Sequence, residues 1–411
     1  MKISVQTVLD LLHSIMHPLS PELVYHLQRT GLICWYLGNR AGFDNAAINN
    51  AWLAGMLHNI GALSKAHTFN GAHGKAFIEE HGRLGASMMS GVRFLQPVTE
   101  ILETRHVEAL DYTQHTMLNT WHLVHMADEF ELWLRGIKGD YVAQRHKIVS
   151  GFLASSPLWP SFLVEALQDA SHEDGFWFRL SSPALQQVLR VISPLNDVVL
   201  DHHDFLEVCL LISNIIDNYS SFTQTHSTSV AHVAAKLAEL YGCDSYTQDK
   251  IRIAGYLHDI GKLCIPLEIL EKQGKLEPEE YAQMKRHSYK TLEMLHPIEE
   301  LDEIVYWAAR HHERLDGSGY PFRLDAAALD IPSRIIAVAD VFTAMTENRP
   351  YRQGMTSEKA LIILEEEAAN FRLDRDIIEL LSHNIAVLRP LVAMHSARQN
   401  PSSHLCRTQI V

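Results

Sequence analysis

The sequence AGYLHDIGKL, residues 254–263, is almost repeated 200 residues earlier as AGMLHNIGAL, residues 54–63. The earlier occurrence has Asn59 and Ala62 where the later one has Asp259 and Lys262. In both, apolar residues recur at helical spacing up to the histidine, which predicts a helix that ends there. Similarity at a fixed separation is typical of a duplicated structural unit.

The similarity extends well beyond these ten residues. His26 precedes His58 by 32 residues, and His226 precedes His258 by the same interval. Three downstream segments of the first copy also match the second, namely HGRLGASMM (His81) with HSYKTLEML (His287), TRHVEALD (His106) with ARHHERLD (His311), and LVHMADEF (Asp128) with IAVADVF (Asp340). The first copy lacks a counterpart to DGSGYPF, which follows the second of these segments in the later copy.

Helical periodicity of apolar residues recurs along the whole chain, and the alternation typical of strands is almost absent. We therefore predict an all-α protein with two tandem domains. The expected boundaries are residues 1–175 for the first domain and 205–400 for the second. Residues 176–204 are expected to form a linker with its own helix, and residues 401–411 a loose C-terminal tail.

The composition is that of an ordinary globular protein, with 47% hydrophobic and 20% charged residues among 411. A formal net charge of −14 argues against binding to a polynucleotide, which needs a basic surface. No apolar stretch is long enough to cross a bilayer, so no membrane association is expected. The five cysteines show no paired spacing, which favours a reducing, cytoplasmic location over a disulfide framework.

Histidine is unusually frequent, with 25 residues. In the second copy, several histidines and carboxylates interrupt otherwise apolar helical faces: His226, His258, Asp259, His287, His311, His312 and Asp340. Imidazole and carboxylate are ligands of first-row transition metals such as iron, manganese and zinc. A carboxylate has two oxygens and can bridge two ions, whereas an imidazole cannot. Seven such residues are too many for one ion, so the pattern predicts two.

The segments HDIGK, HHERLDGSGYP and VADVFTAMTENRPYR resemble the signature of the HD-GYP family, a branch of the metal-dependent HD phosphohydrolases. The resemblance covers about residues 205–400. It implies a helical HD-GYP domain whose metal ligands are the seven residues above, with Asp259 as the bridge. The implied cofactors are two divalent transition metals, iron or manganese ahead of zinc or nickel. Family members with three metals have Glu where this chain has Phe222, which argues against a third ion.

The resemblance also assigns catalytic roles to Asp259 and Lys262, the latter near the scissile phosphate. Arg349 and Arg352 match basic positions around the nucleotide, although a solvated loop is the alternative interpretation of both. The expected reaction linearises a 3′,3′-cyclic dinucleotide by in-line attack of a metal-bridging hydroxide. Cyclic di-GMP and cyclic GMP-AMP stay open as substrates. The DGSGYP loop, residues 316–321, is an expected docking site for a protein partner, and a homodimer is also considered.

A rival interpretation is a weakly catalytic or inactive adaptor that binds nucleotide or protein. The intact ligand set of the second copy argues against it.

The first copy resembles a degenerate HD domain. It retains five of the ligand types, at His26, His58, His81, His106 and Asp128. It replaces the bridging Asp with Asn59, the second His of the adjacent pair with Val107, and the lysine with Ala62. Three interpretations stay open: a scaffold, a sensory domain that binds a small ligand, or a single-metal site formed by His26, His58, Asn59 and Asp128.

Overall fold

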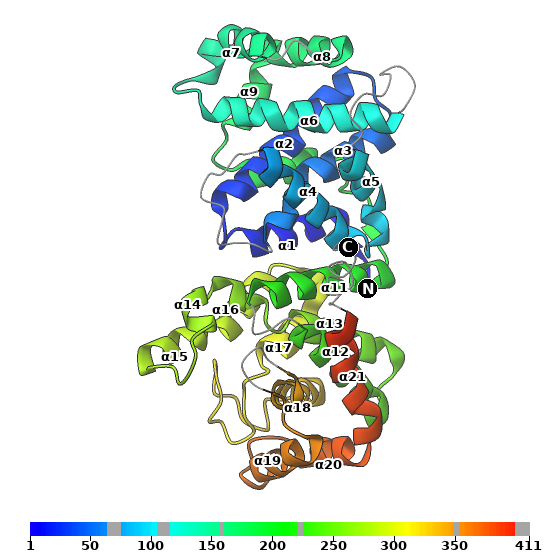
Figure 1. The fold of residues 1–411 in the computed structure, drawn as a ribbon, viewed down its shortest axis with the longest axis vertical. Coiled ribbons are helices and arrows are strands. Elements are labelled where there is room, and N and C mark those ends of the chain that lie inside the picture. Colours follow the sequence, from blue (N-terminus) through cyan, green and yellow to red (C-terminus); the bar gives the residue numbers. More distant parts are fainter. Residues whose placement is uncertain (64–74, 105–115, 156–158, 221–224, 349–352, 399–411) are drawn as a thin grey trace, which may run out of the picture. The chain divides into compact units, whose positions relative to one another are not determined.

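The computed structural model describes residues 1–63, 75–104, 116–155, 159–220, 225–348 and 353–398. The chain divides into two units, Met1–Glu207 and Val208–Val411. Both are built from helices, and helix α11 (His202–Tyr219) contains the boundary between them (Figure 1).

The first unit contains ten complete α-helices, one 3₁₀ helix and a short β-pair among the residues that the structure describes. In chain order they are β1 (Ile3–Ser4), α1 (Val5–Met16), α2 (Pro21–Arg40), α3 (Asn45–Leu57), α4 (Lys75–Met89), the 3₁₀ helix η2 (Arg93–Leu95), α5 (Gln96–Thr104), α6 (Thr116–Arg135), α7 (Tyr141–Ser155), α8 (Ser161–His172), α9 (Asp174–Leu180), α10 (Leu185–Ile192) and β2 (Val199–Leu200). The two strands are antiparallel, with Ile3 opposite Leu200. The central helix α2 packs against α3 and α6.

The second unit repeats this arrangement of central helices. Its elements are α12 (His226–Tyr241), α13 (Ser245–Leu257), η3 (Ile260–Cys264), α14 (Leu267–Leu270), α15 (Pro278–Met284), α16 (Arg286–Leu295), η4 (Glu299–Leu301), α17 (Asp302–Ala309), α18 (Ile331–Thr346), α19 (Ser357–Ala369), α20 (Arg375–His383) and α21 (Ile385–Arg398). Helix α12 packs against α13 and α18, as α2 packs against α3 and α6. The duplication read from the sequence is therefore also a duplication of the helix core.

The helix that ends at the key histidine begins in the same way in both units. The carboxylate of Asp44 caps α3 by accepting from Ala47 N at 2.7 Å, and Asp244 caps α13 by accepting from Thr247 N at 3.0 Å. An N-cap carboxylate accepts from a backbone N–H of the first turn, which has no partner within the helix, and so fixes where the helix starts. With the start fixed, His258 follows directly after Leu257 at the end of α13.

A glycine brings the two central helices close together in each unit. A Cβ added to Gly55 would lie 2.8 Å from the Cα of Gly31, and one added to Gly255 would lie 2.6 Å from the Cα of Ala231. Real side chains do not approach a backbone this closely, so the residue type sets the separation of the helices. The separation of α2 and α3 also sets the distance between His26 and His58. In the second unit, the separation of α12 and α13 sets the distance between His226 and His258 in the same way.

Gly255→Ala is expected to lower the free energy of unfolding by about 1–3 kcal/mol, because the added methyl must push α13 away from α12. Urea denaturation followed by circular dichroism measures this loss. Gly91→Ala is the control, since nothing lies within 4 Å of its added Cβ. Equal stabilities for the two variants would contradict the proposed role of this contact.

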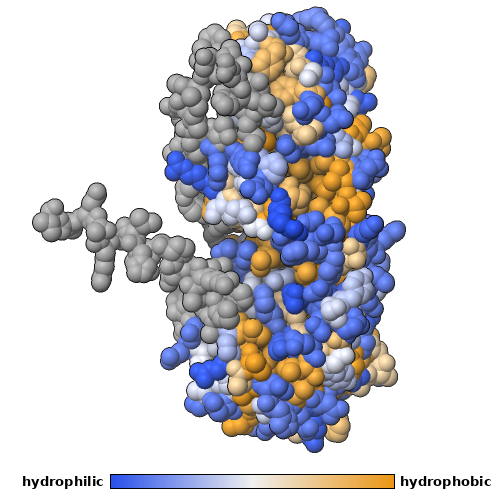
Figure 2. Space-filling view, turned by 90° about the vertical axis from the view of Figure 1, so that its right-hand side faces the viewer, coloured by the Kyte–Doolittle hydropathy of each residue, from blue (hydrophilic) through white to orange (hydrophobic). Residues whose placement is uncertain are grey.

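The all-α prediction is confirmed, with β1 and β2 as the strands among the described residues. Residues 176–204, expected as a linker with a helix, contain most of α9 together with α10 and β2, and they lie in the first unit. The domain boundaries themselves stay a prediction, and the expected tail at 401–411 lies outside the described residues. The face drawn in Figure 2 is mainly hydrophilic with scattered apolar patches. Within the described ranges, no helix has the length and apolar character needed to cross a membrane.

Candidate metal centre

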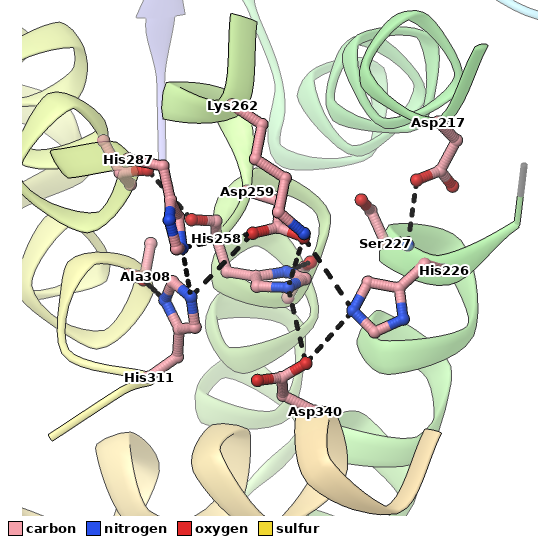
Figure 3. Close-up of polar contacts among 12 residues, drawn as sticks. Asp217, His226, Ser227, His258, Asp259, Lys262, His287, Ala308, His311 and Asp340 are labelled. Carbon is pink, nitrogen blue, oxygen red and sulfur yellow. Dashed lines mark hydrogen bonds and ion pairs between the residues drawn. The ribbon is translucent and has the colours of Figure 1, made fainter. Parts of the chain in front are cut away.

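The structure brings together all seven residues that the sequence predicted as metal ligands. His226 is the first residue of α12, His258 and Asp259 follow α13, His287 lies near the start of α16, His311 and His312 follow α17, and Asp340 lies within α18. Six of them are buried, and the side chain of His312 is 23% exposed. Segments spread over 115 residues thus converge on one point inside the second unit (Figure 3).

One half of the cluster surrounds the Oδ2 atom of Asp259. This oxygen lies 3.2 Å from Nε2 of His258 and 3.8 Å from Nε2 of His226. Nε2 of His226 also lies 3.0 Å from Oδ1 of Asp340. The group of His226, His258 and Asp259 has donor atoms within 4.8 Å of one another, close enough to share an ion.

The other half of the cluster faces the Oδ1 atom of the same carboxylate. Nε2 of His287 lies 3.6 Å from it and Nε2 of His311 lies 3.8 Å from it. These two nitrogens are 3.2 Å apart, and His312 completes the second group whose donor atoms could hold an ion. Asp259 therefore presents one oxygen to each half, which is the geometry of a bridging carboxylate (Figure 3).

Backbone hydrogen bonds fix the orientation of three of the imidazoles. The Nδ1–H of each donates over 2.6–2.8 Å to the carbonyl three residues earlier, pairing His258 with Gly255, His287 with Met284 and His311 with Ala308. A carbonyl oxygen only accepts, so Nδ1 carries the proton and Nε2 presents its lone pair to the centre. Such a bond to the outer nitrogen is what orients metal-binding histidines.

The charge states favour cation binding. Burial lowers the pKa of His287 to about 4 and the pKa of His311 to about 3, so both imidazoles are neutral at pH 7. Burial alone would raise the pKa of Asp259, but His258 and Lys262 outweigh it and hold that pKa well below its usual range. Neutral imidazoles around ionised carboxylates are the protonation states that metal ligands need. Burial lowers the pKa of His226, but Glu347 and Asp340 outweigh it and raise that pKa to about 10, so an ion would have to displace the proton of this ring.

Two buried atoms of the cluster, Nε2 of His258 and Oδ1 of Asp259, have no hydrogen-bond partner in the part of the chain that the structure describes. Leaving a buried polar atom unpaired costs about 1–3 kcal/mol, so such atoms call for an explanation. Both point into the centre, and both are good ligands for transition metals. The residues present therefore fit metal ions, and the chain has clusters that can hold them.

Comparison with known proteins supports the resemblance that the sequence motifs show. A family model described as an HD domain matches residues 210–377. The 3′3′-cGAMP-specific phosphodiesterase 1 of Vibrio cholerae is 29% identical over 377 residues, which cover 88% of this chain and 87% of that protein. A cyclic di-GMP phosphodiesterase of Thermotoga maritima is 38% identical over 170 residues, covering 40% of this chain and 46% of the relative.

The crystal structure of a cyclic GMP-AMP-specific phosphodiesterase of V. cholerae matches with a TM-score of 0.58 at 18% identity, over 94% of this chain and 98% of that one. At 18% identity, this match supports the fold alone. The family match, the relatives and the converged ligand set lead to one assignment. Residues 210–377 form an HD domain, and the second unit, which carries the HD-GYP signature in its sequence, is the HD-GYP half of the chain.

Lys262, the other predicted catalytic residue of the HD-GYP half, lies at the same point. It is in η3, one turn beyond Asp259, and its Nζ donates to Oδ2 of that carboxylate. The lysine side chain is 19% exposed. Its charge therefore lies beside the bridging position and still reaches solvent.

Two carboxylates near the centre were not predicted from the sequence. Glu347 lies just beyond the end of α18, and its carboxylate accepts a hydrogen bond from Nδ1 of His226 at 3.2 Å. It therefore orients the ring of His226, as backbone carbonyls orient the other three imidazoles. Asp217, on α11, accepts from the N–H groups of Ser227 at 3.0 Å and Thr228 at 3.3 Å and so anchors the start of α12 (Figure 3). Glu347 could have been found from the sequence by its spacing, since a residue seven positions after Asp340 lies on the same face of a helix.

The DGSGYP loop is held by a third buried carboxylate. Glu313 is 2% exposed and accepts from Phe322 N at 2.6 Å and Leu324 N at 2.9 Å. Tyr320 of the loop packs its ring 4.8 Å from the ring of His312. Glu313 therefore fixes the loop beside the centre.

Glu313→Ala is expected to lower the free energy of unfolding by about 1–3 kcal/mol, since two backbone N–H groups lose their acceptor. The amides of Phe322 and Leu324 should exchange with solvent faster, which hydrogen exchange resolved by peptide can measure. Glu365→Ala, at an exposed position of α19, is the control. Unchanged exchange across residues 316–324 in the Glu313 variant would contradict this role.

The first copy keeps part of the constellation. His26, His58 and Asp128 lie together and are buried, and Asn59 lies beside them. Ala62 is also buried and offers no charge. His106 and Val107 lie outside the described residues, and the structure does not describe the side chain of His81.

Three other residues named in the sequence analysis, Phe222, Arg349 and Arg352, also lie outside the described residues. Their roles stay predictions.

Proposed function

We propose that the second unit binds two divalent metal ions and hydrolyses a 3′,3′-cyclic dinucleotide to a linear dinucleotide. The observation that carries this proposal is the position of Asp259, whose two oxygens face two separate groups of histidines. The names of the relatives support the reaction, since they are phosphodiesterases of cyclic GMP-AMP and cyclic di-GMP. The catalytic activity therefore belongs to the HD-GYP half of the chain.

In this proposal His226, His258 and Asp340 would hold one ion, and His287, His311 and His312 would hold the other. Asp259 would be a ligand of both. Iron or manganese is the expected pair, with zinc and nickel as alternatives, because mixed imidazole and carboxylate ligands suit all of them. When bound, two such ions activate a water molecule and neutralise the charge of the phosphate.

The chain's own residues supply the remaining parts. Lys262 donates to the negative charge that develops on the phosphate, and burial of the centre strengthens that interaction. Glu347 holds the ring of His226 in place through Nδ1. The DGSGYP loop, fixed by Glu313, forms one side of the site next to His312.

Cyclic GMP-AMP is the substrate that we propose as preferred, with cyclic di-GMP as the alternative. The support is the relative that matches across both halves of the chain, a 3′3′-cGAMP-specific enzyme. The test is turnover of cyclic GMP-AMP, cyclic di-GMP and cyclic di-AMP by metal-reloaded protein, with products identified by mass spectrometry. We expect a linear dinucleotide and the highest kcat/KM for cyclic GMP-AMP. Binding of all three without turnover would instead support an adaptor.

Arg349 and Arg352 are proposed to contact the nucleotide away from the metals. Changing either to Ala is expected to lower kcat/KM about tenfold or more and to shift the preference among the three substrates, since a bidentate arginine–guanine contact contributes about 1–3 kcal/mol. Metal content and slow cleavage of bis(p-nitrophenyl) phosphate serve as the controls and should stay unchanged. If both variants kept wild-type kinetics with every cyclic dinucleotide, the two arginines would be solvated loop residues that do not contact the substrate.

We also propose a cytoplasmic location for the protein, a protein partner at the DGSGYP loop and a homodimer. They rest on the sequence analysis alone.

A further inference from the structure

The first unit contains a compact cluster of metal-ligand side chains of its own. Nε2 of His26 lies 3.2 Å from Nε2 of His58, and Oδ1 of Asp128 lies 3.1 Å and 3.4 Å from these two nitrogens. The amide group of Asn59 lies 2.9 Å from Nε2 of His58 and 3.4 Å from Nε2 of His26. Four side chains from α2, α6 and the end of α3 thus meet at one point.

These separations match those between ligands of a single ion. Ligands about 2.1 Å from a metal are separated by roughly 3.0 Å in octahedral and 3.4 Å in tetrahedral geometry. The observed distances between the donor atoms of His26, His58 and Asp128 run from 3.1 to 3.4 Å. An ion at ordinary bond lengths therefore fits among the three without moving them.

The orientation of both rings supports the same assignment. Nδ1 of His58 donates to the carbonyl of Gly55 at 3.0 Å, as Nδ1 of His258 does to Gly255 in the HD-GYP half. Nδ1 of His26 contacts the carboxylate of Glu131. Both rings then direct the Nε2 lone pair toward Asp128, and these electron-rich atoms repel one another unless a cation lies between them.

Asp128 supplies an independent observation. Its side chain is 10% exposed, and among the described residues its Oδ1 atom has no hydrogen-bond partner although it faces both imidazoles. The atoms left unpaired in the HD-GYP half, Nε2 of His258 and Oδ1 of Asp259, are likewise ligand atoms that face the centre.

We propose that His26, His58, Asn59 and Asp128 bind one divalent transition-metal ion in the first unit. The site holds a single ion because Asn59 replaces the carboxylate that would bridge to a second. The amide oxygen of Asn59 is a neutral ligand, and a 180° flip of the amide group presents it to the ion. Arg135 and Arg29 lie 2.8 Å and 3.4 Å from Glu131 and balance its buried charge. The ion is structural, since Ala62 stands where catalysis needs a lysine.

The same atoms have one metal-free alternative. Burial lowers the pKa of His26, but Asp128 and Glu131 outweigh it and raise that pKa to about 9. A protonated His26 would then lie between the two carboxylates, while Asn59 would donate to His58. The Asn59→Asp variant separates the two. It adds a charged ligand for an ion but removes the donor on which the metal-free arrangement depends.

The first experiment counts ions on the full-length chain after chelator treatment and reloading with Mn²⁺. Two ions in the HD-GYP half and one in the first unit give about three per chain. Asp128→Asn should reduce this to about two, and electron paramagnetic resonance should lose the signal of an isolated Mn²⁺. Asp340→Asn should keep that isolated signal. A wild-type count equal to that of Asp128→Asn, with no isolated Mn²⁺ signal, would overturn the proposal.

The second experiment keeps the proposal testable if Asp128→Asn fails to fold. Asn59→Asp should be stabilised by Mn²⁺ more strongly than the wild type, seen as a larger rise in Tm, because a bound ligand stabilises the folded state by mass action. A lower Tm that Mn²⁺ does not restore would favour the protonated His26 arrangement. Because the HD-GYP half is unaltered, cyclic dinucleotide turnover tests the proposed function separately.

Discussion

Asp259→Ala is expected to abolish cyclic dinucleotide hydrolysis, with a fall in kcat on the order of 10³-fold or more. The two oxygens of this carboxylate face the two sets of histidines, so without it both ions would lose a shared, negatively charged ligand. Several kcal/mol of charge stabilisation then disappears, and each 1.4 kcal/mol corresponds to about tenfold in rate. Steady-state kinetics combined with metal analysis should show activity and metal lost together.

Asp197→Ala is the matched control, since Asp197 is exposed and belongs to the first unit. It should keep wild-type kinetics and metal content. If Asp259→Ala retained more than a few per cent of the wild-type rate, the chemistry would have to occur elsewhere in the chain.

Lys262→Met is expected to lower kcat about 10²–10³-fold while the ions stay bound, the usual effect of removing one donor to a developing negative charge. The variant keeps the length of the side chain and removes only the ammonium group beside Asp259. KM should change much less than kcat, because the lost interaction strengthens in the transition state. Kinetics and metal counting on one preparation provide both readouts.

Lys290→Met is the comparison, because that lysine pairs with Glu293 and is 41% exposed. Loss of metal from Lys262→Met would mean that the lysine supports the ligand Asp259 and does not act on the substrate.

The convergence of the seven predicted ligands could be read from the sequence because they follow from local patterns that the duplication makes visible, while their roles as ligands stay a prediction. A histidine at the end of a capped helix and an Asp on a buried helical face are recognisable one segment at a time. The comparison of His58-Asn59 with His258-Asp259 also indicated which copy had lost its bridge. In the structure, the predicted ligands of the second copy lie around the carboxylate of Asp259.

The supporting carboxylates could not be predicted in the same way. Glu313, Glu347 and Glu131 act through contacts with residues distant in sequence or on other elements, and an isolated Glu on a helix usually faces solvent. Their roles depend on tertiary packing, which brings Glu347 to His226 across 121 residues. The place of residues 176–204 in the first unit also follows from contacts between segments distant in sequence, such as the pairing of β2 with β1. Such contacts could not be read from local patterns.

The most direct test of the central claim is hydrolysis of cyclic GMP-AMP by the metal-reloaded chain in ¹⁸O-labelled water, analysed by mass spectrometry. If the HD-GYP centre activates water for attack at phosphorus, the linear dinucleotide should carry one ¹⁸O in its terminal phosphate. Chelator-treated protein and the Asp340→Asn variant should form almost no product. Absence of labelled product from the fully reloaded wild-type chain, with cyclic GMP-AMP and with cyclic di-GMP alike, would contradict the account.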